Sequence, residues 1–293
     1  MSTLAVAKKD FRAARRSRVL WAVAVVLGMV GALQAYVSRG FDETPTAVVQ
    51  ELFRALTLTL AVLLPIVALV ASYLAIAGER EGGGIKFLLS LPNTRRDVFV
   101  GKLLSRLGVV AAGVGFVYLG AISTALARHG AFPAGVVAGT LGLTLVYGSV
   151  FVSVAVSLSA AVAARSRAIA GAMASYFVLV VMYVVPLIQV PRMVRFVHTT
   201  LLGADPNPDL YNAVQYTSPF VAYRKAANLV VPTDLRRPIF TSSLPDDVAY
   251  GSSEANTVLP LYLQDEFSVV VLAVWLVVPP LVGYWLFERS DLE

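Results

Sequence analysis

Residues 78–102 read GEREGGGIKFLLSLPNTRRDVFVGK and decide how the rest of the chain is interpreted. The three glycines at 82–84 allow the backbone to reverse, because glycine reaches positive φ without steric cost. Pro92 ends the short apolar stretch at 85–91, since proline disfavours a helical conformation at the residue before it. Thr94 and Asp97 have the spacing of a capping box, which predicts that a new helix begins there.

These signals together predict a small apolar helix that carries Phe87, Leu88 and Leu89. The helix is too short to cross a bilayer, which requires roughly 20 apolar residues. Its neighbours are basic, so we expect it at the membrane surface. Two membrane helices need no such segment in order to reverse direction, and we therefore expect a partner to dock on it.

The composition is that of a helical membrane protein. The 293 residues are 57% hydrophobic and 14% charged, the mean hydropathy is +0.73, and a soluble domain would carry about 25% charged residues. The absence of cysteine excludes disulfides, thiolate metal sites and a cysteine nucleophile. His129 and His198 are too few for a histidine-rich metal site. The net charge is +6. The basic residues cluster beside apolar segments, which favours anionic lipid over nucleic acid as their partner.

The apolar runs predict an all-α polytopic membrane protein with one transmembrane domain over residues 1–293. Residues 2–18 are expected to form an interfacial helix, with a plain basic flank as the alternative. The first span follows this basic stretch and has spanning length, so we expect it to remain as an anchor. Six transmembrane helices are expected at about 19–37, 53–77, 102–127, 134–163, 168–190 and 267–287.

The loops complete this prediction. Residues 78–101 form a cytoplasmic loop with its short helix, and residues 191–266 form a long extracytoplasmic loop between helices five and six. Prolines make turns in the long loop, except that Pro219–Val231 is predicted to be helical. We expect this loop to cap the bundle.

The distribution of basic residues predicts the orientation. Fifteen lysines and arginines fall on flanks and short loops of one side, against Arg39, Arg54 and Arg128 on the other. By the positive-inside rule, both termini are cytoplasmic in a multi-pass protein of the plasma membrane.

The common catalytic motifs are absent. The sequence contains no G-x-x-x-x-G-K-[ST], no H-E-x-x-H and no G-x-S-x-G, so we predict no catalytic, cofactor-binding or metal-binding residues in this chain. The centres of the spans nearly lack ionisable residues, which argues against an intramembrane proton or sodium relay.

Small and hydroxyl-bearing residues recur along three spans. The serines of the fourth span favour close helix packing, with hydroxyls bonded to their own helix. In the second and fifth spans, packing and the lining of a pathway remain equal alternatives. The candidate lining residues are Thr57, Pro65, Ser72, Ser175, Tyr176 and Tyr183.

The segment 78–102 resembles the ABC-2 type permeases, the membrane subunits of a class of ATP-binding cassette exporters. That family commonly has acidic residues, a glycine, paired leucines, a proline, an arginine and Gly-Lys between its second and third spans. The corresponding residues here are Glu79, Glu81, Gly83, Leu88, Leu89, Pro92, Arg95 or Arg96, Gly101 and Lys102. Gly84 departs from the pattern, because many members have threonine there. The basic N-terminus, the six-span layout and the aromatic-acidic end at 285–292 agree with the family, and the long outer loop loosely resembles the permease of the nitrous-oxide reductase maturation system.

The resemblance implies a membrane subunit that forms a pathway with a second copy or a homologue, works in export and contacts membrane lipid. A separate ATPase subunit would bind ATP and Mg and drive it through residues 78–102, with Phe87 added to the coupling residues above. No cofactor is expected in this chain. A membrane scaffold or sensor, and a secondary transporter or intramembrane enzyme, are the alternatives. The substrate class stays open.

Overall fold

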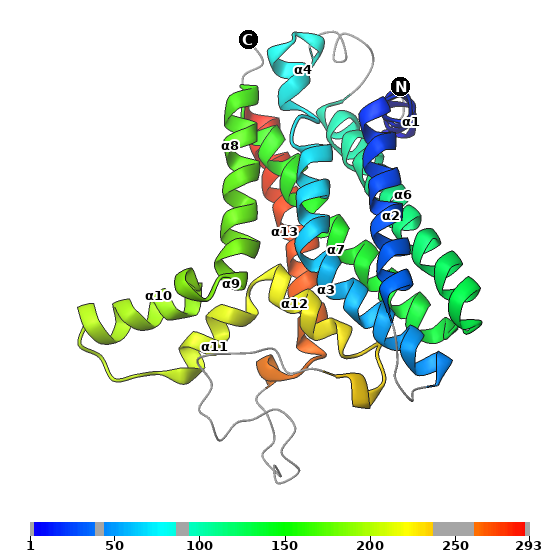
Figure 1. Ribbon diagram of the computed structural model, residues 1–293. Helices are drawn as coiled ribbons and strands as arrows, with labels where there is room; N and C mark the ends of the chain where they lie inside the picture. Colours follow the sequence, from blue (N-terminus) through cyan, green and yellow to red (C-terminus); the bar gives the residue numbers. More distant parts are fainter. Residues whose placement is uncertain (1–2, 39–43, 86–93, 237–260, 291–293) are drawn as a thin grey trace.

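The computed structural model describes residues 3–38, 44–85, 94–236 and 261–290, and its regular elements there are all helical. The long helices stand side by side as a bundle, with α1 and α4 at one end and α10, α11 and α12 at the other (Figure 1). We call these the α4 end and the α12 end. The elements are α1 (Thr3–Arg15), α2 (Arg18–Val37), α3 (Pro45–Ser72), α4 (Ala77–Glu81), α6 (Arg95–His129), α7 (Ala134–Ala161), α8 (Arg165–Tyr176), η1 (Phe177–Val181), α9 (Met182–Val184), η2 (Pro186–Ile188), α10 (Val190–Phe196), η3 (Val197–Leu201), α11 (Pro208–Tyr216), α12 (Pro219–Ala227), η4 (Thr233–Leu235), η5 (Leu261–Leu263) and α13 (Phe267–Arg289).

Five helical segments of the described chain are long and apolar enough to cross a membrane. They are Pro45–Glu81, Arg95–His129, Ala134–Ala161, Arg165–Val184 and Phe267–Arg289. The first predicted span coincides with α2, whose apolar part, Trp21–Val37, is shorter. The all-helical architecture is thus confirmed for the described residues, with five candidate spans by length and composition where six were predicted.

Local capping explains where several helices begin and end. α3 starts at Pro45, before the predicted 53, because the Thr44 side chain accepts a hydrogen bond from the Ala47 amide at 3.3 Å and proline suits the first helical position. The predicted capping box at α6 is present, with Thr94 and Asp97 bonded to each other's backbone amides. The fifth span ends at Val184 and not at 190, since Val185 is extended before a proline.

The α12 end is more helical than the sequence predicted, because α10, η3 and α11 precede α12. Helix α12, predicted as 219–231, ends at Ala227, and the Ser218 hydroxyl caps its start. Tyr223 on α12 is fully buried and stacks on Tyr147 of α7, with ring centroids 4.1 Å apart. The predicted cap on the bundle is therefore present in α12, whereas α10 and η3 extend sideways from the bundle (Figure 1).

Glycines bring α2 and α6 into backbone contact. A Cβ atom at Gly31 would lie 2.2 Å from the carbonyl oxygen of Val117, and a Cβ atom at Gly120 would lie 2.2 Å from the carbonyl oxygen of Gly28. Small residues permit this approach in membrane proteins, where packing rather than water exclusion drives helix association.

We predict that Gly120→Ala destabilises the protein although alanine favours helix. Its methyl group would separate α2 from α6, at a cost of about 1–3 kcal/mol. Gly115→Ala on the same helix is the matched control, because nothing lies within 4 Å of its Cβ position, and it should be neutral or slightly stabilising. Thermal unfolding of both variants in detergent tests this. Equal melting temperatures would contradict the backbone contact.

Candidate functional site

The candidate site is the α4 end of the bundle, because both described ends of the 78–102 segment lie there. α4 and the first turns of α6 bound this segment. Gly83 has φ +70° with open space around its Cβ position, which confirms a glycine-dependent turn. Phe87, Leu88, Leu89 and Pro92 lie outside the described residues, so the short apolar helix stays a prediction.

A buried ion-pair cluster joins α1, α4 and α6. The Lys102 side chain is 4% exposed, and its ammonium donates to Asp10 at 2.7 Å and to Glu79. Arg106 lies 3.3 Å from Asp10 and donates to the Ala71 carbonyl at 3.1 Å. Two acids and two bases therefore compensate one another in a place where an unpaired charge would be costly.

The cluster keeps Asp10 ionised. Burial alone would raise the pKa of Asp10, but attraction to Lys102 and Arg106 outweighs it and holds that pKa below its ordinary value. Because the pKa of Asp10 is lower in the folded state, its interaction with Lys102 and Arg106 stabilises the protein at neutral pH. This stability is lost only as the pH falls through the folded-state pKa.

Gly101 and Lys102 both hold α1 in place. A Cβ atom at Gly101 would lie 2.8 Å from the Val6 Cβ atom and 3.0 Å from the Thr3 carbonyl oxygen. The Thr3 hydroxyl also donates to Asp97 at 2.5 Å. The Gly-Lys pair thus positions the N-terminal helix within the chain, which is a structural task distinct from direct contact with a partner.

Helix α4 is tied to the last turn of α7 and to the first residue of α8. The Ser159 hydroxyl accepts hydrogen bonds from the amides of Ile76 and Ala77 at 3.0 and 2.9 Å. The Arg165 amide donates to the Glu81 carboxylate at 2.6 Å. Glu79 and Glu81 therefore both hold α4, one toward α6 and the other toward α8.

Arg95 connects the start of α6 with the end of α13. Its guanidinium donates to the carbonyl oxygens of Phe287, Glu288 and Ser290, each at 2.8 Å. A cation there satisfies carbonyls that the helix end leaves without partners. Arg96 is exposed, so of the two predicted arginines Arg95 ties helices together and Arg96 faces outward.

The candidate pathway residues are placed differently in the two spans. Thr57, Pro65 and Ser72 are buried within the chain. Ser175, Tyr176 and Tyr183 are half-buried, and their hydroxyls donate to the carbonyls of Gly171, Val62 and Val214 at 2.8, 3.4 and 3.5 Å. Their role as pathway lining stays a prediction. In α7, Ser149 and Ser157 donate to Leu145 and Ser153 of their own helix, which confirms the packing interpretation there.

An apolar groove of about 770 Å³ lies between α3 and the α8–η1 helix. Its walls include Ile66 and Val70 of α3, with Met173 and Phe177 on the other side. Val70 is 65% and Met173 68% exposed. This face of the second and fifth spans is therefore uncovered in the single chain, unlike the buried Thr57, Pro65 and Ser72 of α3.

The sequence interpretation missed Asp10, Ser159 and Arg165. One signal could have revealed the first, because Asp10 is the single acidic residue within the basic stretch 2–18. Such a residue requires a basic partner once the helix packs against the bundle.

These features define the class: a helical membrane protein without an ATP-binding motif, whose long helices are braced at one end around the 78–102 segment. The family model described as ABC-2 family transporter protein matches residues 4–292, and the chain belongs to this family. It is 27% identical over 259 residues to the probable ABC transporter permease protein NosY of Pseudomonas aeruginosa, an alignment that covers 82% of this chain and 89% of NosY. Permeases of this type are normally not catalytic themselves, and the ATPase activity resides in a partner.

We predict that Lys102→Met lowers the free energy of unfolding by about 3 kcal/mol, because the largely buried Asp10 and the partly exposed Glu79 lose their shared cation and only Asp10 keeps another, Arg106. Denaturant unfolding in detergent measures this. Adding Asp10→Asn should restore part of the loss, giving a coupling energy above about 1 kcal/mol.

Arg96→Met on the same helix is the matched control, since Arg96 is exposed. The ion-pair cluster would be unimportant for stability if Lys102→Met and Arg96→Met unfolded alike.

Proposed function

We propose that this chain is the permease subunit of an ABC exporter, that two copies or a copy and a homologue form the pathway, and that a separate ATPase drives it through residues 78–102. Both termini are cytoplasmic in this proposal, so the α4 end faces the ATPase. The ATP and Mg belong to the partner. Membership of the ABC-2 family and the similarity to NosY support it.

The observation that carries the proposal is the bracing of both ends of the 78–102 segment. Glu79 is fixed to α6 and Glu81 to α8, while Arg95 is fixed to α13. A force applied to the segment between them would therefore reach three long helices rather than a loose loop. Such rigid linkage is what a coupling element requires in order to bias two arrangements of the bundle.

The second copy is proposed to lie on the groove between α3 and α8. The Arg165–Val184 segment has little of its surface buried within the chain, although α3 beside it is largely buried on its other side. A pathway between two copies would place these exposed faces opposite each other.

We predict that Met173→Cys becomes crosslinked between two copies by a short bismaleimide in native membranes. The chain has no cysteine of its own, so every crosslink reports the introduced residue. Leu119→Cys on α6 is the control, because it is similarly exposed, at 61%, but lies away from the groove. Denaturing gel electrophoresis should show a dimer band for Met173→Cys alone. A monomer in both variants would leave the groove to lipid and contradict this interface.

We predict that Leu88→Asp weakens binding of the co-expressed candidate ABC ATPase by about ten- to a hundredfold, because burying such a side chain is worth roughly 1.5–3 kcal/mol. The melting temperature of the chain itself should be unchanged. Co-purification and titration of the ATPase measure the effect, and stimulated ATP hydrolysis should be lost.

Leu261→Asp is the matched control, since Leu261 is 67% exposed and belongs to η5, which contacts α11 at the α12 end. It should bind the ATPase normally. Unchanged affinity in Leu88→Asp would mean that this segment contacts lipid only, which favours the scaffold alternative.

A further inference from the structure

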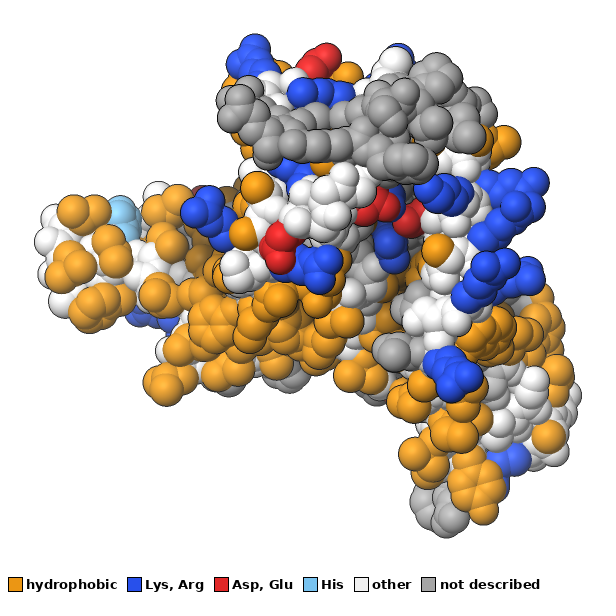
Figure 2. Space-filling model, turned by 90° about the horizontal axis from the view of Figure 1, so that it is seen from above, with side chains coloured by type: hydrophobic (Ala, Val, Ile, Leu, Met, Phe, Trp, Pro, Cys, Tyr) orange, Lys and Arg blue, Asp and Glu red, His pale blue; other side chains and the backbone are white. Residues whose placement is uncertain are grey.

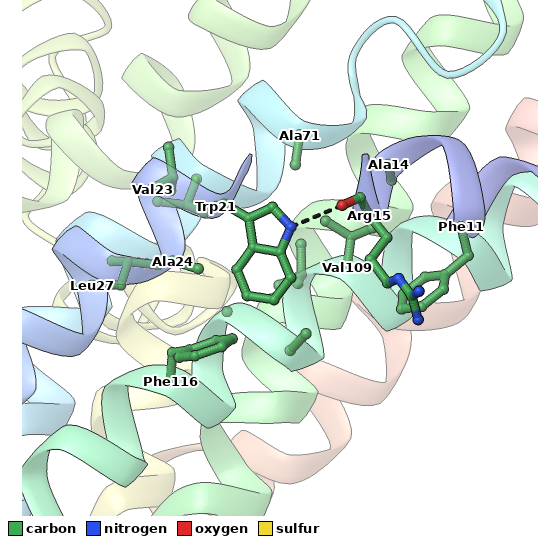
Figure 3. A pocket seen from close by; sticks show the side chains of 14 residues that line it. Phe11, Ala14, Arg15, Trp21, Val23, Ala24, Leu27, Ala71, Val109 and Phe116 are labelled. Atoms are coloured by element: carbon green, nitrogen blue, oxygen red, sulfur yellow. Dashed lines mark hydrogen bonds between the residues drawn. The ribbon is translucent and has the colours of Figure 1, made fainter. Parts of the chain in front are cut away.

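A cavity of about 170 Å³ lies where the elbow between α1 and α2 meets α3 and α6. Figure 3 shows Trp21 of α2 and Phe116 of α6 in its wall, with Ala71 of α3 above Trp21 in this view. Its walls are apolar apart from Arg15, which lies at the edge beside Phe11 (Figure 3). Such a space does not favour water, because water needs two to four polar partners.

The elbow holds the cavity open toward the outside of the bundle. The Trp21 indole donates to the Arg15 carbonyl at 2.8 Å and packs edge-on against Phe116, with centroids 5.7 Å apart. Trp21 is 48% exposed, so the cavity can be entered beside it from the lateral face. Tryptophan at the start of an apolar helix is typical of the headgroup level of a membrane.

Arg15 lines this cavity, and three more arginines lie close to it in the sequence. Arg12, Arg15, Arg16 and Arg18 are exposed, and no ion pair among the described residues involves them. Asp10, the acid of α1, is already engaged by Lys102 and Arg106. Figure 2, which looks onto the α4 end, shows Lys and Arg side chains gathered along one side of the molecule.

We propose that the cavity holds a segment of one acyl chain of an anionic phospholipid, and that Arg15, with Arg12 and Arg18 close to it in the sequence, binds the lipid phosphate. Because the bilayer and the cavity are equally apolar, an acyl chain gains no hydrophobic free energy by moving into the cavity. It gains the dispersion contacts that an empty cavity lacks. Selectivity therefore comes from charge, at about 1 kcal/mol for each Lys or Arg near an anionic surface. The bound lipid would brace α1, the helix that carries Asp10.

The test uses the position of Trp21 in the cavity wall. Trp275→Phe and Trp285→Phe leave Trp21 as the single tryptophan, since the chain has three. The full chain is reconstituted in nanodiscs that contain a small fraction of phosphatidylglycerol with brominated acyl chains, or of equally brominated phosphatidylcholine. Bromine quenches tryptophan only at short range. We expect half-maximal quenching of Trp21 at about a five- to tenfold lower mole fraction of phosphatidylglycerol.

Arg15→Gln should abolish most of this preference. Arg167→Gln is the matched control, because Arg167 is exposed at the start of α8, and it should keep the preference. Ala24→Phe, which fills the cavity, should reduce quenching by both lipids. Because Ala24→Phe could fail to fold, the comparison of Arg15→Gln with Arg167→Gln is sufficient to decide the test.

Equal quenching by the two lipids would overturn the proposal, because the site would then have no preference for an anionic lipid. Equal loss in Arg15→Gln and Arg167→Gln would overturn it in favour of diffuse charge attraction. None of these measurements involves the ATPase or transport. Their failure would leave the proposed permease function untouched, and failure of ATPase binding would leave the lipid site untouched.

Discussion

Burial of the Lys102 ammonium is the constraint on which the α4 end of this protein depends. A lysine that is almost entirely enclosed must have its charge compensated, and here the compensation comes from Asp10 and Glu79 on two different elements. Removing a charge from water is costly, and the attraction repays that cost only with good geometry. The positions of α1 and α4 relative to α6 are therefore linked: neither can move far without stranding a buried charge.

Helix α6, which carries Lys102, is also subject to a second constraint, its close contact with α2. In lipid, helices gain little from hiding apolar surface and associate through packing. The glycines of α2 and α6 allow their backbones to touch, and this places the beginning of α2 beside the middle of α6. The elbow between α1 and α2 is thus fixed at both of its ends, by the ion-pair cluster on α1 and by the glycine contact on α2. The cavity lies in the angle that remains between these two contacts.

The sequence was most informative about local features and least informative about what joins them. Hydropathy predicted the long helices, and the Thr94–Asp97 capping box was predicted because its partners are three residues apart. The Thr3–Asp97 bond joins residues 94 apart and the Arg95–Phe287 bond residues 192 apart, and no local pattern encodes such a pairing. The helices α10 and α11 were missed because proline was interpreted as forming turns, whereas proline at a first helical position starts a helix, as Pro208 does in α11.

The Gly-Lys pair at 101–102 has contacts that its sequence pattern did not predict. The sequence placed both residues among those expected to couple the chain to a partner. In the structure, Gly101 faces Val6 and Lys102 is enclosed, so neither is available on the surface. Their contribution is to fix the end of the segment. A coupling element needs both a surface that the partner touches and anchors that resist the load, because a surface on a loose loop would transmit nothing to the helices. Glu79, Glu81, Arg95 and Lys102 satisfy the second requirement, and the first remains the proposed role of Phe87, Leu88 and Leu89.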